Sequence, residues 1–405
     1  MIHTWKKYKL SEIGSVVGGA TPSTTVDAYY NGDIPWLTPK DLSNFHERYI
    51  ERGERNITKS GLNSCSAQLL PAGSVLFSSR APIGYVAIAK NPIATNQGFK
   101  SIIPNPEKVD SLFLYYLLKY NKDNIEAMGS GTTFKEVSGA TMKNIEVYLP
   151  EDLEEQRRIA GILESLDDKI ELNRRINANL EAQAQALFRS WFVDFEPFRD
   201  GPFVDSELGK IPQGWKVGAA SEFYKNITIG KTPPRKEHQW FSKESHDIVW
   251  VSIADMGNCG LSICNSSEYL TPEAIKKFNI CIVPVNTVLL SFKLTIGRVA
   301  IADKELATNE AIAHFQTQHN TLEYTYLALK NYEFSSLGST SSIATAVNSK
   351  IIKSMPWMMP SDDVLNQFHN VLSPIFNGIR NNIQEITRLS ALRDTLLPKL
   401  MAGEF

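Results

Sequence analysis

The sequence is poor in the residues that build metal sites and disulfide frameworks. Its 405 residues contain four cysteines, and no two of them form a C-x-x-C pair: Cys65, Cys259, Cys264 and Cys281. No second ligand pair is spaced to complete a zinc site, so we interpret all four as reduced thiols. The sequence has no run of about 18 apolar residues, and its first residues lack the apolar segment of a signal peptide. It therefore predicts a cytoplasmic protein without a membrane contact.

Motifs that bind nucleotides or perform catalysis are also missing. There is neither a G-x-x-x-x-G-K-[S/T] phosphate loop nor an H-E-x-x-H zinc motif, and no tetrapeptide resembles the NPPY or DPPY of amino-methyltransferases. Residues 129–134 contain G-x-G but lack the third glycine of a dinucleotide site. Carboxylates near lysines, such as Glu136 beside Lys135, do not cluster as a magnesium-dependent nuclease requires. We therefore expect no catalytic residue, no metal and no cofactor in this chain.

Positive charge is scarce for a nucleic-acid-binding protein, because the net charge is −2. The distribution is uneven. Residues 1–150 carry 16 basic and 13 acidic side chains, residues 151–200 carry 7 and 12, residues 201–360 carry 15 and 14, and residues 361–405 carry 4 and 5. Such a chain would hold DNA weakly alone, so tight binding is expected to need a basic partner.

The sequence does contain a long internal repeat. Six segments recur in the same order at offsets of 209 to 214 residues, beginning at residues 19 and 230, 34 and 248, 71 and 284, 83 and 296, 94 and 307, and 129 and 338. The period is far longer than that of a solenoid, so it indicates a duplicated domain. Matched residues are mostly Gly, Pro, Ala, Val, Ile and Trp, whereas polar residues differ: Gln97 against Glu310, Tyr85 against Arg298, and Arg80 against Leu294 or Lys293. The pattern favours one scaffold with two different polar surfaces.

Each copy is predicted to be a mixed α/β domain with many short strands. Residues 75–79 and 85–89 are strand-like and separated by a Pro-Ile-Gly turn, and residues 288–292 and 298–301 repeat them. Residues 112–118 and 324–329 suggest one buried helix per copy. Residues 203–214, rich in Pro and Gly, are interpreted as the linker into the second copy.

A long helix is expected after each copy. Pro150 and Pro360 are followed by acidic residues, which suit a helix N-terminus. Apolar residues then recur at alternating spacings of three and four, as in a coiled coil. The predicted seam comprises Leu166, Ile170, Asn173, Leu180, Leu187, Ile375, Ile379, Asn382, Ile386, Leu389 and Leu396. The two asparagines occupy equivalent seam positions, where a buried Asn fixes register.

At about 1.5 Å per residue, 35 to 40 residues extend roughly 55 Å, more than one small domain covers. The alternative is two amphipathic helices packed on their own domains. We predict an α+β fold with two pseudo-symmetric α/β domains separated by a pair of long antiparallel coiled-coil helices. The segments are residues 1–150, 151–200, 201–360 and 361–405.

Several motifs resemble those of the specificity subunits of type I restriction-modification systems. They are the P-x-G-S-V-L…I-G-x-V-A-I…A-T-N-Q core of residues 71–97, the stretch E-Q-R-R-I-A-G-I-L with L-D-D-K-I at 155–170, and L-R-D-T-L-L-P-K-L-M-A-G at 392–403. The resemblance covers essentially the whole chain. It departs in the second copy, where residues 363–368 lack the E-Q-R-R-I-A-like stretch, so a partner is expected to contact the two helices unequally.

The resemblance implies two target-recognition domains, each reading half of a split double-stranded DNA site across a gap set by the helices. It also implies two modification subunits that methylate adenine N6 with S-adenosylmethionine. Restriction subunits using ATP and Mg²⁺ join in some systems, and a methylase-only assembly stays open. The rival hypotheses are a self-contained nuclease or methyltransferase, and a protein-binding scaffold that never touches DNA.

Base reading needs donors and acceptors on protruding segments, such as Arg or Lys for guanine and Asn or Gln for adenine. Arg80 and Lys293 are the strongest candidates, because each is a cation directly after a strand-like run. Asn96 and Asn309 recur unchanged, which favours a role in the turn framework. The full candidate set is Thr21, Ser23, Lys40, Ser79, Arg80, Asn96, Gln97, Thr132, Thr133 and Lys135 in the first copy, and Thr232, Arg235, Lys236, Asp255, Lys293, Arg298, Asn309, Ser339 and Ser341 in the second.

Overall fold

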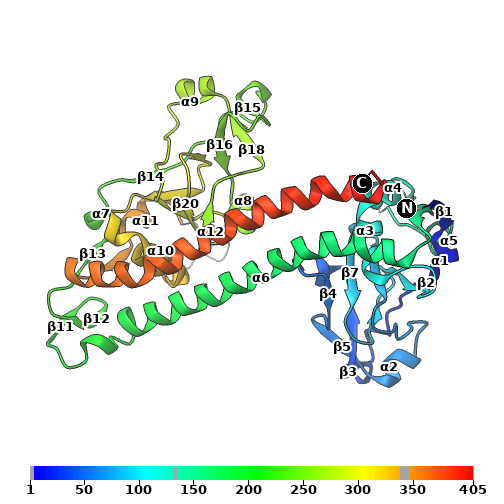
Figure 1. The fold of residues 1–405 in the computed structure, drawn as a ribbon. Helices are drawn as coiled ribbons and strands as arrows, with labels where there is room; N and C mark the ends of the chain where they lie inside the picture. The colour runs from blue at the N-terminus through cyan, green and yellow to red at the C-terminus, as the bar shows by residue number, and fades with distance from the viewer. Residues whose placement is uncertain (1–3, 132–134, 338–346, 405) are drawn as a thin grey trace. The chain divides into compact units, whose positions relative to one another are not determined.

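The computed structural model describes residues 4–131, 135–337 and 347–404 (Figure 1). The chain divides into two compact units. The first combines residues 1–172 with residues 385–405, and the second comprises residues 173–384. Two helices of 40 residues each, α6 (Leu153–Phe192) and α12 (Asp362–Met401), contribute to both units.

The first unit contains ten strands and five short helices before α6, in the part of the chain that is described. In chain order they are β1 Trp5–Lys9, α1 Leu10–Ile13, β2 Gly14–Gly18, β3 Tyr30–Leu37, β4 Tyr49–Ile50, β5 Arg55–Ile57, α2 Lys59–Asn63, β6 Val75–Ser79, β7 Ile83–Ala89, β8 Ala94–Thr95, β9 Lys100–Pro104, α3 Ser111–Tyr120, α4 Lys122–Ala127, α5 Gly139–Asn144 and β10 Glu146–Pro150. Short 3₁₀ helices occupy Asp27–Tyr29 and Pro39–Leu42.

The first unit is organised around a five-stranded sheet of order β2-β9-β6-β7-β4. A second sheet has the order β5-β3-β8, and β1 pairs with β10. Helix α3 begins at the N-cap Asp110, whose carboxylate accepts hydrogen bonds from the backbone amides of Leu112 and Phe113. Its apolar residues then pack with strand residues such as Phe77 in one core.

The second unit repeats this arrangement. Its elements are β11 Phe203–Ser206, β12 Gly209–Pro212, β13 Lys216–Ala219, α7 Ala220–Phe223, β14 Ile227–Ile229, β15 Phe241–Ser242, β16 Ile248–Val251, α8 Ile253–Asn258, β17 Ser262–Ile263, β18 Glu268–Leu270, α9 Pro272–Phe278, β19 Val288–Ser291, β20 Val299–Ala302, β21 Ala307–Thr308, β22 Ile312–Phe315, α10 Leu322–Lys330, α11 Ser349–Ser354 and β23 Pro356–Met359. Further 3₁₀ turns lie at His238–Trp240, His319–Thr321 and Phe334–Leu337.

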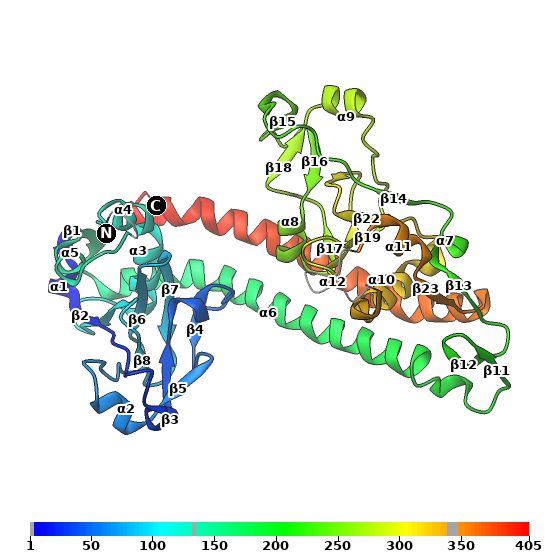
Figure 2. The same cartoon turned by 180° about the vertical axis from the view of Figure 1, so that it is seen from behind.

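The duplication appears in the strand orders. The five-stranded sheet of the second unit runs β14-β22-β19-β20-β17, the same order of equivalent strands as in the first. Figure 2 shows β14, β22, β19 and β17 of this sheet. The smaller sheets also correspond, because β3 pairs in parallel with β8 as β16 does with β21. The predicted mixed α/β class, the central strands and one buried helix per copy are therefore confirmed.

Some predicted boundaries differ from the structure. The strand expected at 85–89 begins at Ile83, because the β6–β7 ladder shifts register between Phe77 and Ser79 and continues to Ile83. The strand expected at 298–301 begins one residue later, because the Arg298 amide donates to the Ser291 side chain instead of the ladder. The predicted linker is a β-hairpin, β11 paired with β12.

Within each unit the two long helices pack antiparallel. In the first unit, Arg393 of α12 pairs with Asp167 of α6 at 2.7 Å. In the second, the Asn382 side-chain amide donates to the Asn177 oxygen at 2.8 Å. All eleven predicted seam residues are buried or half-buried. Asn382 therefore pairs with Asn177, one helical turn away from the equivalent Asn173.

The long helices also pack on their own domains, as the alternative interpretation proposed. Ile159 and Leu163 of α6 belong to the core of the first unit, which includes Leu400 of α12. Phe368 and Leu372 of α12 belong to the main core of the second unit. Each helix thus uses one stretch for a domain and another for its partner helix.

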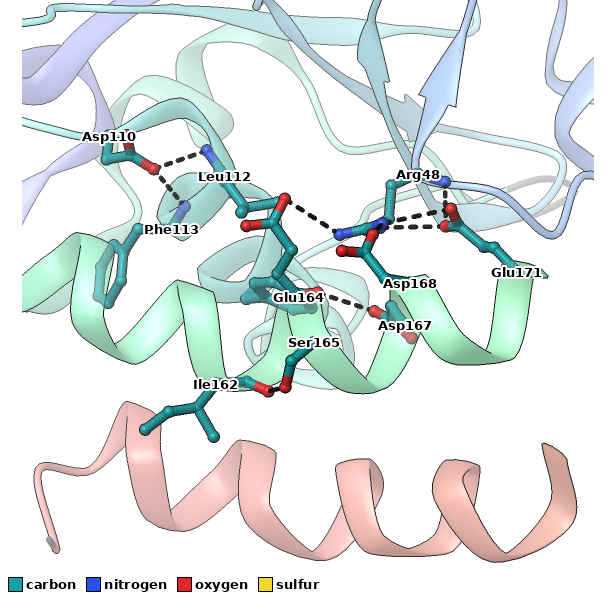
Figure 3. Close-up of polar contacts among 11 residues, drawn as sticks. Arg48, Asp110, Leu112, Phe113, Ile162, Glu164, Ser165, Asp167, Asp168 and Glu171 are labelled. Carbon is teal, nitrogen blue, oxygen red and sulfur yellow. Dashed lines mark hydrogen bonds and ion pairs between the residues drawn. The ribbon is translucent and has the colours of Figure 1, made fainter. Parts of the chain in front are cut away.

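A buried arginine fastens the first domain to α6 (Figure 3). Arg48 precedes β4 and is 3% exposed. Its guanidinium and backbone amide both donate to Glu171 at 3.0 Å, and it also pairs with Asp168 and Glu164. Although burial alone would lower the pKa of Arg48, the hydrogen bonds to Glu171 and Asp168 raise it above its usual value. This ion cluster holds the strand edge of the domain against the helix.

Candidate nucleic-acid interface

In the first copy, the loop after β2 rests on the turn after β8. The Ala20 amide donates to the Thr95 carbonyl at 3.0 Å, and a Cβ at Gly19 would collide with the Asn96 carbonyl. Only glycine permits this approach. It places the hydroxyl of Thr21 in hydrogen-bond contact with the side-chain oxygen of Gln97. The exposed Gln97 is therefore fixed by a neighbouring loop.

The second copy builds the same junction from different residues. The Lys231 amide donates to the Thr308 carbonyl at 3.0 Å, and Gly230 lies too close to Thr308 and Asn309 for any side chain. The hydroxyl of Thr232 then donates to the carboxylate of Glu310. The junction is thus conserved between copies, while an amide in one is a carboxylate in the other.

In each copy, a buried tryptophan donates a hydrogen bond to the backbone of this loop. The indole nitrogen of Trp36 donates to the Ala20 carbonyl at 3.0 Å, and that of Trp250 donates to the Lys231 carbonyl at 3.1 Å. Both tryptophans are buried on the strands β3 and β16. These matched contacts explain why the tryptophans recur in the repeat.

The hairpin between β6 and β7 lies close to this junction. Ser78 donates its hydroxyl to the Pro82 carbonyl at 2.8 Å and accepts from the Tyr85 amide, which fixes the hairpin end. Beyond it, Arg80 pairs with Glu136 at 3.4 Å. Lys100 pairs with the other oxygen of Glu136 at 3.2 Å, and its ammonium lies 3.4 Å from the Gln97 carbonyl. Arg80 and Gln97 therefore belong to one polar cluster.

The hairpin of the second copy has an apolar tip. Ser291 makes the same contacts as Ser78, donating to the Thr295 carbonyl at 2.7 Å. The structure thereby matches Arg80 with Lys293 rather than with Leu294. Leu294 itself is 99% exposed and has a φ of 60°, a conformation that costs about 1 kcal/mol for a side chain of this type. Sequence reasoning did not select this residue.

Charge is balanced differently around Glu310. Burial would raise the pKa of Glu310, but the hydrogen bond from Thr232 and the charges of Lys293 and Arg235 lower it below its usual value. Arg235 also pairs with Glu268 at 2.8 Å and lies over the rings of Phe241 and Trp250. The carboxylate of Glu310 is therefore ionised at neutral pH and sits beside two cations.

Comparison with known proteins decides the family. A family model of the type I restriction modification DNA specificity domain matches residues 2–182 and again residues 212–389. The chain belongs to the type I restriction-modification specificity subunits.

Relatives of the specificity subunit match over nearly the whole chain. It is 38% identical to the type I restriction enzyme MjaIX specificity subunit of Methanocaldococcus jannaschii, over 99% of this chain and 93% of that protein. It is 25% identical to the HindI specificity subunit of Haemophilus influenzae, over 99% of both chains. The crystal structure of a type I S subunit from M. genitalium shares the fold, with a TM-score of 0.56 at 16% identity over 98% of this chain and 96% of that one.

The specificity subunit shows no metal cluster in the described residues, where no group of three or more His, Cys, Asp or Glu side chains could hold an ion. Its four cysteines are free and half-buried. No described helix is both long and apolar enough to cross a membrane.

The structure distributes the predicted reading residues unevenly. Ser23, Lys40, Arg80, Gln97, Lys135, Arg235, Lys236 and Lys293 are exposed or half-exposed, and Thr21 and Thr232 support Gln97 and Glu310. Lys40 pairs with Glu54 at 3.0 Å on an exposed surface. Thr132, Thr133, Ser339 and Ser341 lie outside the described residues.

Four of the predicted residues make hydrogen bonds within their own domains, two near helix α8 and two in the turns after β8 and β21. Asp255 caps helix α8 by accepting from Ser252, and Arg298 donates to the Ile253 carbonyl at 2.5 Å. The side-chain oxygens of Asn96 and Asn309 accept from backbone amides two residues later. The expected role of these asparagines in the turns agrees with this geometry.

Ser79 is the clearest correction in the first copy. Its side chain is fully buried and donates to the Gly98 carbonyl at 3.2 Å. The prediction that Ser79 contacts DNA does not fit this structure, because its hydroxyl is buried and bound to the backbone.

Glu310 was matched with Gln97 in the repeat but was left out of the candidate set. The signal that identifies it is its match with Gln97 in the repeat, together with the match of Thr232 with Thr21. No feature of the sequence marked Leu294 as exposed, because its place in the hairpin between β19 and β20 is known only from the structure.

Proposed function

We propose that this chain is the non-catalytic DNA-recognition subunit of a type I restriction-modification complex. Each copy would read one half of a bipartite site in double-stranded DNA. The observation that supports this most directly is the matched junction of the two copies, where identical backbone contacts present Gln97 in one and Glu310 in the other. Because the frameworks match and the exposed groups differ, the two half-sites should differ in sequence.

The long helices would set the gap between half-sites and dock two modification subunits. Those subunits would bind S-adenosylmethionine and methylate adenine N6, and restriction subunits, where present, would use ATP and Mg²⁺. The net charge of −2 supports a dependence on partners, since phosphate contacts by basic side chains supply most of the non-specific affinity for DNA. The complex would act in the cytoplasm.

Genome-wide mapping of methylated bases tests the proposal. Strains with and without this chain, both expressing the modification subunit, should differ by one bipartite, asymmetric adenine-methylation motif. The absence of any difference would contradict DNA recognition. Methyl transfer by the purified chain alone, with labelled S-adenosylmethionine and DNA, would contradict a non-catalytic role.

A further inference from the structure

We propose that Gln97 and Glu310 are equivalent base-reading positions, at which the first copy reads adenine and the second reads cytosine. This inference rests on the proposed function, because it requires that both copies contact base edges. It adds the identity of one base in each half-site.

The two side chains occupy the same place in the fold. Each follows an Ala-Thr-Asn turn, and each accepts from a threonine hydroxyl on the loop after the first strand of the large sheet. The turn asparagine is engaged with the backbone in both copies. Gln97 and Glu310 are therefore the exposed side chains that this turn presents.

The threonine contact leaves each side chain able to pair with a base. In the first copy, the Gln97 oxygen accepts from Thr21 and keeps a second lone pair, while its amide nitrogen keeps two protons. A glutamine in this state can accept from adenine N6 and donate to adenine N7, the bidentate pairing that amides make in the major groove. Cytosine offers no acceptor beside its amino group, so it would satisfy only half of this amide.

The carboxylate of Glu310 has only acceptors, because it is ionised. Thr232 occupies one oxygen, and the other can accept from the N4 amino group of cytosine. Adenine and guanine both place the N7 lone pair beside the atom that would be contacted, which repels a carboxylate. The charges of Lys293 and Arg235 lower the pKa of Glu310, and Lys293 offsets part of its repulsion from DNA phosphates.

The surroundings also differ in the expected direction. In the first copy, Lys100 and Arg80 share the carboxylate of Glu136, and the neutral Gln97 needs no counter-ion. In the second copy, Ala313 of β22 occupies the position equivalent to Lys100, and the charge of Lys293 lowers the pKa of Glu310. Each surround suits the side chain that it holds.

Reciprocal substitutions test the assignment. Gln97→Glu and Glu310→Gln would be introduced separately into the full chain, expressed with its modification subunits, and the methylation motif mapped. Glu310→Gln should change one C·G pair to A·T in one half-site, and Gln97→Glu should change one A·T pair to C·G in the other. The preference at that base pair should shift by about tenfold or more, the effect of one good bidentate contact.

Matched controls use the same chemical changes elsewhere. Glu305→Gln and Gln68→Glu alter exposed side chains before β21 and β6, at the opposite ends of the strands from the hairpin tips. Both should leave the motif unchanged. A variant that no longer methylates the genome would be assayed as the assembled complex, by competition between duplexes that differ at single base pairs.

The outcomes separate the inference from the proposed function. If the wild-type complex defines a bipartite motif but both variants keep all of its bases, the assignment of Gln97 and Glu310 is wrong and DNA recognition stands. The same holds if both variants alter the same half-site. If the wild-type chain confers no motif at all, the proposed function itself fails.

Discussion

A histidine is buried at the centre of the second unit. His314 on β22 is fully buried, with Thr228 at 2.8 Å from Nδ1 and the Thr308 hydroxyl at 2.7 Å from Nε2. A neutral ring satisfies both threonines, because one nitrogen donates and the other accepts. Burial lowers the pKa of His314 to about 4. Thr308 belongs to the turn that presents Glu310, so the ring supports the reading junction.

The depressed pKa predicts acid sensitivity. Below pH 6.5 the unfolded chain binds a proton at His314 that the folded chain excludes until about pH 4, so stability falls as the pH decreases through this window. The loss should reach about 1.4 kcal/mol per pH unit. Denaturant unfolding of the wild type and His314→Gln between pH 7.5 and 4.5 measures it, with the exposed His246→Gln as control. Equal pH slopes for wild type and His314→Gln would contradict the prediction.

At the scale of residues, the sequence indicated which segments carry exposed polar side chains better than it indicated which atoms those side chains contact. The repeat located both threonine–turn junctions, because glycine, threonine and tryptophan recur wherever the backbone makes the same approach. It could not show that Ser79 is buried, since the end of β6 and the burial of its last residues depend on tertiary packing. Composition does not reveal the cation–π contacts of Arg235 with Phe241 and Trp250, nor the hydrogen bonds by which Asp255 caps α8.

The long helices attach to their domains through ion pairs of opposite sense. In the first unit, Glu171 of α6 forms an ion pair with Arg48 of the domain. At the equivalent position of α12, Arg380 lies 3.3 Å from Asp303 of its domain and donates to Asn286 at 2.9 Å. The helix thus supplies the acid in one unit and the base in the other. The two attachments also use different positions of the repeat, because Leu261 corresponds to Arg48 and Lys90 corresponds to Asp303.

Removing the buried arginine should destabilise the first unit. Arg48→Met would leave Glu171, which is 14% exposed, without its counter-ion, at a cost of about 3 kcal/mol. The matched control is Lys40→Met, because the Lys40–Glu54 pair is largely exposed and should contribute less than about 1 kcal/mol. Denaturant unfolding compares the two variants. A loss for Arg48→Met no larger than that for Lys40→Met would show that the cluster adds no stability.

At the scale of elements, helix periodicity was the most informative signal. The three-four spacing located both 40-residue helices, and proline with acidic residues marked where they begin. The opposite charges of Glu171 and Arg380 in these attachments were not predictable. Their partners Arg48 and Asp303 lie next to strand ends, and the distance of these ends from the helices depends on tertiary packing. The hairpin β11–β12 was missed for a related reason, since its Gly and Pro residues suit a loop equally well.

For the whole molecule, we predict that helix length determines the gap in the DNA site. Deleting residues 172–178 and 381–387 together removes one heptad from each helix and takes out the paired Asn177 and Asn382. Seven residues span about 10.5 Å, the rise of about three base pairs. The mapped methylation motif should therefore lose about three base pairs from its gap and keep both half-sites. The control replaces exposed residues of the same heptads with alanine, and an unchanged gap in the deletion variant would refute the ruler hypothesis.

The duplication itself was evident from the sequence, because its framework residues recur at nearly constant offsets. The grouping of residues 385–405 with the first unit was less evident, since domain boundaries drawn along the chain follow sequence order. It becomes clear only when Leu400 and Met401 appear in the same core as Phe113.

That grouping affects how the protein is made. Leu400 and Met401 are each 2% exposed within the core of the first unit, so this core lacks part of its packing until the ribosome has translated the entire second unit. Nascent chains carry an unfinished first unit throughout the synthesis of residues 173–384. During that interval the part of α6 that packs against residues 385–401 lacks its partner helix. A ribosome that stalls within α12 would leave the first core without Leu400 and Met401.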